Sequence, residues 1–170
     1  MVVLEGVALR SPSVQKFMVR TQAAALRRVL EQVTLDQHAR VAVVGGGLFP
    51  RTVLALWQVQ PDARLTVIDA SAHNIALAKA YLGTLPESRL PTFECAFYDP
   101  ERNAHFDVVI IPMGYMGDRS DLYEPQQGPI LLIHDWLWRR RGDGGVPVSA
   151  LLAKRLNFVR PAGAQRRFAL

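Results

Sequence analysis

Residues 41–52 read VAVVGGGLFPRT: an apolar run, three glycines and then Pro50, which can open a helix. A short, nearly continuous apolar run is typical of a strand buried on both faces of a parallel sheet. Two further runs of this kind follow, LTVID at 65–69 and FDVVII at 106–111. The first ends at Asp69 and the second is closed by Pro112, so both predicted strands stop at turn-forming or polar residues.

Helical and strand patterns alternate outward from these runs. Ser11 as a cap and Pro12 in the first helical position predict a long amphipathic helix that ends near residue 35. Two shorter helices are predicted after the first two strands, one opened by Pro50 and the other capped by Ser71. The remaining predictions are strands at 92–98, 130–133 and near 157–160, and a helix at about 148–157.

Strands separated by helices join through right-handed crossovers and build a mostly parallel sheet. The sequence therefore predicts an α/β fold, doubly wound and Rossmann-like, with a long N-terminal helix and a shortened C-terminal end. A length of 170 residues suits one domain, with a helical segment at 1–38 and a ligand-binding core at 40–138. Ligands of such folds bind beyond the carboxyl ends of the strands, where the strand order reverses.

The composition is that of a globular protein, with 49% hydrophobic and 21% charged residues. No apolar run approaches the roughly 20 residues that cross a bilayer, and the first residues lack the pattern of a secretory signal. The single cysteine, Cys95, cannot form an internal disulfide and is expected in the core. We therefore expect a soluble, cytoplasmic protein without a membrane span.

The net charge is +5, and basic residues gather after residue 138, where Asp143 is the only acid. This end would suit an anionic acceptor, although a solvated surface explains it as well. A nucleic-acid partner is not excluded, but no interleaved aromatic residues or known motif support one. The long first helix would lie over the edge of the ligand site or join a homodimer interface.

The glycine turn and Asp69 predict a site for a nucleoside. Gly45, Gly46 and Gly47 let the backbone approach a ligand at the start of a helix, where free N–H groups point outward. A carboxylate at Asp69 can accept hydrogen bonds from the two ribose hydroxyls. The third glycine of a dinucleotide fingerprint is replaced by Pro50, and no P-loop lysine follows. The remaining candidate ligand is a cofactor with one nucleoside, such as S-adenosylmethionine.

Five segments in order resemble the successive motifs of class I S-adenosylmethionine-dependent methyltransferases: VAVVGGGLFPRT, LTVIDASAHNIALAKAYL, PTFECAFYD, FDVVIIPMGY and LLIHDW. The resemblance implies that Gly45 and Gly47 face the methionine part of the cofactor and that Asp69 binds its ribose. It also implies that Asp99 approaches the adenine amino group. Ala70 and Phe97 or Tyr98 would flank the adenine ring, and Pro112 would complete the cofactor site.

The sequence departs from the family pattern in three places. Val43 stands where the family usually has an acid, and Phe49 stands where a further glycine is common. The residues after Trp138 leave little room for the terminal two-stranded hairpin of the family, so a partner subunit could supply part of the substrate side. The segment GGGLFPRT also resembles the turn of nicotianamine synthases, which transfer an aminocarboxypropyl group from the same cofactor.

These observations favour methyl transfer to a small or medium acceptor molecule. Aminocarboxypropyl transfer is the first alternative, and it would release methylthioadenosine where methylation releases S-adenosylhomocysteine. A degenerate domain that binds or assembles without catalysis is the second alternative. A dinucleotide enzyme is the third, and Pro50 disfavours it.

The candidate catalytic residues follow the fourth and fifth predicted strands. His134 is the natural base near neutral pH, and Asp135 could act instead or bind the substrate. Tyr115 would help to form the wall of an acceptor pocket. No metal is predicted, because Trp136 replaces the second residue of the Asp-Asn pair that holds magnesium in catechol-type methyltransferases, and the four histidines lack ligand spacing.

Overall fold

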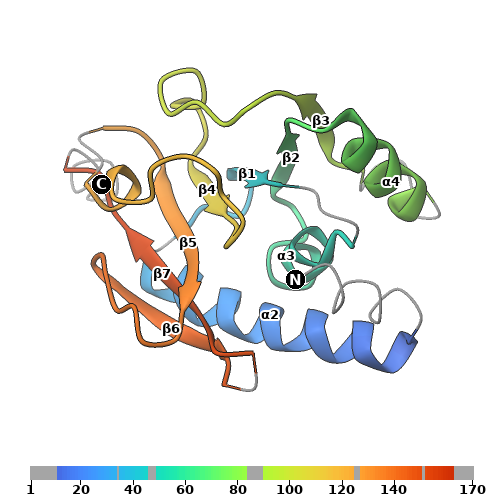
Figure 1. The fold of residues 1–170 in the computed structure, drawn as a ribbon, viewed down its shortest axis with the longest axis horizontal. Coiled ribbons are helices and arrows are strands. Elements are labelled where there is room, and N and C mark those ends of the chain that lie inside the picture. Colours follow the sequence, from blue (N-terminus) through green and yellow to red (C-terminus); the bar gives the residue numbers. More distant parts are fainter. Residues whose placement is uncertain are drawn as a thin grey trace.

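The computed structural model describes residues 11–33, 35–45, 49–83, 90–124, 127–150 and 152–162. Within them, seven strands form one sheet in the order β3-β2-β1-β4-β5-β7-β6 (Figure 1). The strands are β1 (Arg40–Val44), β2 (Arg64–Asp69), β3 (Thr92–Cys95), β4 (Val108–Ile111), β5 (Ile130–Trp136), β6 (Gly144–Ser149) and β7 (Lys154–Val159). The helices are α2 (Pro12–Val33), α3 (Arg51–Val59), α4 (Ala72–Leu82) and the short 3₁₀ helix η2 (Asp121–Tyr123).

Strands β1 to β5 are parallel to one another, as the sequence predicts. The order runs from β1 through β2 to β3 on one side and continues with β4 and β5 on the other. The reversal therefore lies between β1 and β4, where this type of sheet binds ligands. Strand β5 is longer than predicted, so His134 and Asp135 lie inside it rather than after it.

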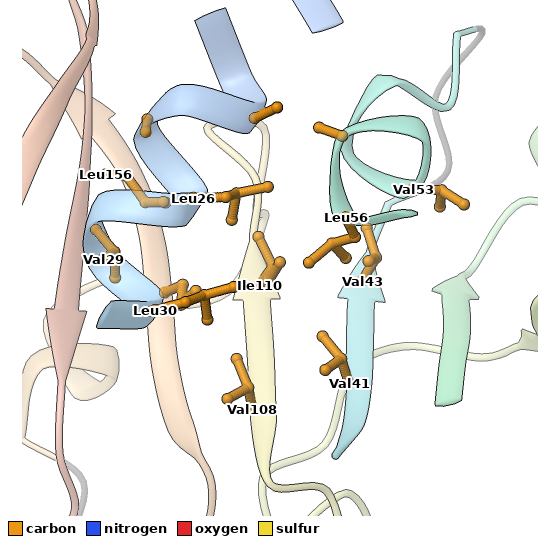
Figure 2. Close-up of a cluster of buried hydrophobic side chains, with 14 of the residues drawn as sticks. Leu26, Val29, Leu30, Val41, Val43, Val53, Leu56, Val108, Ile110 and Leu156 are labelled. Atoms are coloured by element: carbon orange, nitrogen blue, oxygen red, sulfur yellow. The ribbon is translucent and has the colours of Figure 1, made fainter. Parts of the chain in front are cut away.

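The N-terminal helix begins at Pro12, as predicted, and ends at Val33. Leu26 and Val29 are fully buried against the sheet, whereas Phe17, which the helical pattern predicts on the same stripe, is half exposed. Figure 2 shows side chains of α2 and α3 meeting those of β1 and β4 in one apolar layer. Burial of each such leucine or valine contributes about 1.5–3 kcal/mol to stability.

The two faces of the sheet are covered differently. Alternate residues of each central strand belong to different clusters: Val43 and Ile110 pack with α2 and α3, whereas Val44 and Ile111 pack on the other face. Leu82 of α4 belongs to the same cluster as the residues of α2 and α3. In the part of the chain that the structure describes, no α-helix contributes to the second cluster. Irregular segments with tyrosines cover that face instead.

The C-terminal end differs from the prediction. The helix predicted at about 148–157 is wrong, because β6 and β7 form an antiparallel hairpin there and β7 also pairs with β5. Every residue of β7 is buried between its two neighbours, so the sheet environment overrides the helix-like local pattern. The hairpin also fits within the residues after Trp138, which corrects the expectation that there was little room for it.

Cys95 is exposed at the end of β3, not buried in the core as predicted. Strand β3 lies at the edge of the sheet, where the end of a strand lacks neighbours on one side. Among the described residues, no helix combines the length and the apolar character that crossing a membrane requires.

Candidate functional site

A cavity of about 710 Å³ lies at the carboxyl ends of the parallel strands. Its volume is within the range of ordinary small-molecule sites. Seven predicted site residues line it: Gly45, Asp69, Ala70, Tyr98, Pro112, Tyr115 and His134. Gly46 and Gly47 lie outside the described residues, and Asp99 and Asp135 are not part of the lining.

At the reversal of strand order, the turn after β1 contacts the end of β4. Gly45 has a φ of +78°, and its N–H donates to the carbonyl of Ile68 over 2.7 Å. A Cβ atom at this position would lie 3.2 Å from Cγ of Pro112. Both the backbone conformation and the narrow space therefore favour glycine. The absence of a side chain leaves the backbone open to a ligand.

Asp69 ends β2, and its carboxylate is held in place by the start of α4. The N–H of Ser71 donates to Oδ1 over 2.8 Å, and the side-chain amide of Asn74 lies 3.3 Å from both oxygens. Ser71 also caps α4 by accepting from the N–H of Asn74. The sequence does not reveal that Asn74 orients this carboxylate.

Two tyrosines from different loops form one wall. The rings of Tyr98 and Tyr115 lie 6.2 Å apart in an edge-to-face arrangement. Burial, followed by the proximity of Tyr115 and Asp99, raises the pKa of Tyr98 to about 12. Burial also raises the pKa of Tyr115. Both phenols are therefore protonated at neutral pH and can donate hydrogen bonds. At the rim, Phe97 and Met116 are strongly exposed.

His134 enters the cavity from the side of the sheet that α2 covers. Its Nε2 lies 2.8 Å from the side-chain nitrogen of Gln22, an amide that donates, so the imidazole proton lies on Nδ1. Burial, and after it the positive charges of Arg51, Lys154 and Arg119, lower the pKa of His134 to about 3. The ring is neutral at pH 7 and far less basic than its sequence context indicates. Its role as a base stays a prediction.

Asp135 points to the opposite face, since neighbours on a strand alternate. It is buried and accepts from the Tyr123 hydroxyl and from the Trp136 N–H, each over 2.8 Å. The guanidinium of Arg119 lies 4.0 Å away, and the side-chain amide of Asn157 donates to the Tyr123 hydroxyl. The side chains of the two adjacent catalytic candidates, His134 and Asp135, therefore lie on opposite faces of the sheet.

Asp99 is exposed, and its carboxylate accepts from the N–H groups of Glu101 and Arg102. These bonds shape the turn after β3. Two cationic residues that sequence reasoning missed do line the cavity: Arg51 at the start of α3 and Lys154 at the start of β7. Lys154 lay within the wrongly predicted helix, so no sequence signal placed it here. Among the described residues, no cluster of three His, Cys, Asp or Glu could hold a metal ion.

Comparison with known proteins supplies fold relatives and one sequence relative. No family model matches the sequence. A 92-residue stretch is 34% identical to ribosomal RNA small subunit methyltransferase H of Rippkaea orientalis, a match that covers 54% of this chain and 29% of that protein. The chain thus aligns with less than a third of that relative's length.

Solved structures match over more of the chain. MtNAS, a nicotianamine synthase solved with MTA and tNA, matches 91% of this chain and 67% of its own, with a TM-score of 0.62 and 14% identity. A mutant of the same protein was solved with S-adenosylmethionine. An RNA methyltransferase from Salinibacter ruber, bound to S-adenosyl-L-homocysteine, matches 78% of this chain and 86% of its own, with a TM-score of 0.55 and 18% identity.

Proposed function

We propose that this chain, which has the fold of the class I S-adenosylmethionine-dependent methyltransferases, binds S-adenosylmethionine and transfers its methyl group to an acceptor. The observation that carries the proposal is the cavity at the reversal of strand order. There, the turn at Gly45 approaches Pro112 closely, and Asp69 presents a carboxylate at the end of the neighbouring strand.

The residues present fit this cofactor. Asp69 would accept hydrogen bonds from the ribose hydroxyls, and Asn74 keeps its carboxylate in position. Ala70 and Tyr98 line the same end of the cavity and would flank the adenine. Gly45 would face the amino-acid part. When bound, the cofactor supplies a methyl group on a sulfonium, which needs only an acceptor atom held in line.

The protein's contribution to the reaction would be positioning and the exclusion of water. Tyr115 would pack against the acceptor as a protonated phenol. His134 would accept a proton only weakly at Nε2, where Gln22 already donates, so acceptors that need little deprotonation fit best. Asp135 would stabilise the site from the other face, through the network with Tyr123 and Arg119.

Aminocarboxypropyl transfer is the second candidate function. The likeness to MtNAS extends over 91% of this chain and favours it. The two reactions leave different products, S-adenosylhomocysteine after methyl transfer and methylthioadenosine after aminocarboxypropyl transfer.

Product analysis separates the candidates. The protein would be incubated with S-adenosylmethionine and pooled small-molecule acceptors, and the nucleoside products would be quantified by mass spectrometry. We expect acceptor-dependent S-adenosylhomocysteine. Acceptor-dependent methylthioadenosine would replace the proposal by the second candidate. With an acceptor found, His134→Ala should lower kcat while leaving cofactor affinity unchanged, and equal turnover would show that His134 is structural.

A further inference from the structure

The described lining of the cavity carries both positive and negative charge. Asp69 is the one carboxylate among its described lining residues and stands at the end of β2. The two cations of that lining, Arg51 and Lys154, come from the start of α3 and from β7. His134 adds a polar but neutral ring between them. A ligand group that lies near these cations is therefore expected to be anionic.

Lys154 and His134 lie on the same face of the sheet. In the antiparallel pairing of β5 with β7, Lys154 is opposite Trp136 and Leu156 is opposite His134. Residues two apart on a strand share a face, so Lys154 is the diagonal neighbour of His134. Lys154 is only 9% exposed, and both side chains line the cavity. The hairpin therefore brings a buried ammonium group to the β5 end of the site.

This position lies beyond the proposed cofactor. From β1, where the glycine turn begins, the sheet continues through β4 and β5 to β7. Three strand spacings of about 4.8 Å place Lys154 roughly 14 Å along the sheet from the turn. The adenosine would occupy the opposite direction, toward Asp69 on β2. Lys154 is therefore on the side from which an acceptor would approach the methyl group.

We propose that Lys154 binds an oxyanion of the acceptor, a carboxylate or a phosphate, and that the substrate is consequently an anionic small molecule. The inference rests on the proposed function, because that function defines which end belongs to the cofactor. Lys154 has other interactions within the protein. An ammonium group is a compact charge that forms charge-assisted hydrogen bonds to carboxylates and phosphates.

Electrostatics supports this assignment. The charges of Arg51 and Lys154 reach His134, where they add to the effect of burial in lowering its pKa. The three residues thus share one region of positive potential, and the low exposure of Lys154 and His134 limits screening by water at those two residues. Such a region attracts oxyanions, and the neutral imidazole adds a polar contact without a competing charge.

Nuclear magnetic resonance can test the proposal on the whole chain. ¹⁵N-labelled protein saturated with S-adenosylhomocysteine would be titrated with sodium succinate and, separately, with sodium phosphate, at constant ionic strength. We expect at least one of the two anions to shift the Trp136 indole and the Gln22 side-chain amide saturably. The more effective anion identifies the oxyanion class. Lys154→Met should weaken this binding at least about tenfold, the scale of a lost charge-assisted hydrogen bond.

Two matched variants accompany this measurement. Lys154→Arg keeps the charge and should retain binding, which separates a lost charge from a damaged hairpin. Lys79→Met removes a lysine of α4 that lies over the ring of Phe93, outside the cavity lining, and should leave the titration unchanged. The spectrum of each variant reports whether it is folded.

Three results would overturn the proposal: no saturable shift with either anion, equal shifts in Lys154→Met, or anion binding that S-adenosylhomocysteine displaces. The last result would assign the cations to the cofactor's own carboxylate. Failure of the proposed function is seen separately, because S-adenosylhomocysteine would then not bind at the start of the experiment.

Discussion

The two faces of the sheet meet at β5, where His134 and Asp135 are neighbours in sequence but belong to different environments. On the side of α2 and α3, His134 is neutral, contacts Gln22 and opens into the cavity. On the other side, Asp135 accepts hydrogen bonds from Tyr123 and Trp136 in a closed network. The polar pair near the end of this strand therefore holds one residue that faces the cavity and one that lies in a hydrogen-bond network on the other face.

The largest effect is expected from Asp135→Ala. The variant leaves the Tyr123 hydroxyl and the Trp136 N–H without their charged acceptor, and we expect the free energy of unfolding to fall by about 2–3 kcal/mol. Urea denaturation measures this loss. The control Asp107→Ala removes the exposed ion-pair partner of Arg40 and should cost less than the loss at Asp135. Equal losses would show that Asp135 does not hold the second face together.

The pH dependence of stability tests the burial of His134, on the face that α2 and α3 cover. The folded chain holds His134 with a pKa of about 3, whereas an unfolded histidine titrates near 6.5. The contribution to stability is therefore complete above pH 6.5 and is lost as the pH falls toward 3. Between pH 7 and pH 5 the loss is about 2 kcal/mol. Urea denaturation at both pH values should show this extra loss in the wild type and not in His134→Gln. The same pH dependence in both would mean that His134 is not buried as described.

The smallest effect is expected from Tyr123→Phe, which sharpens the account of the second face. It removes the hydroxyl that donates to Asp135 and accepts from Asn157, at an expected cost of about 1 kcal/mol. Tyr81→Phe is the matched control, since that hydroxyl donates to the neutral amide of Gln15 and should cost less. A larger loss in Tyr81→Phe would contradict the importance assigned to the Asp135 network. Thermal denaturation can rank the two variants.

The parallel part of the fold could be predicted from the sequence, because buried parallel strands are continuous apolar runs bounded by glycine, proline or polar residues. Three residues of that kind, Gly45, Asp69 and Pro112, were correctly expected at the strand ends and line the cavity, whereas His134 lines the cavity from inside β5. Their roles toward a cofactor remain proposals.

The hairpin could not be predicted, because its stability comes from pairing with β5 rather than from local propensity. The segment predicted as a helix contains Val148, Leu152 and Leu156 four residues apart, a spacing that suits a helix, and only pairing within the sheet decides against it. The contributions of Lys154 and Gln22 to the site depend on this packing. His134 and Asp135 point to opposite faces of the sheet because β5 extends through both of them, and this length of β5 was not predicted.

The central claim is that the cavity binds S-adenosylmethionine. Calorimetric titration with S-adenosylmethionine and S-adenosylhomocysteine, and with NADH as the control, tests it most directly. We predict micromolar binding of the first two alone, weakened about ten- to a hundredfold in Asp69→Ala by the loss of charge-assisted hydrogen bonds to the ribose. Folded protein that binds neither of them, or an Asp69→Ala variant with unchanged affinity, would contradict the account.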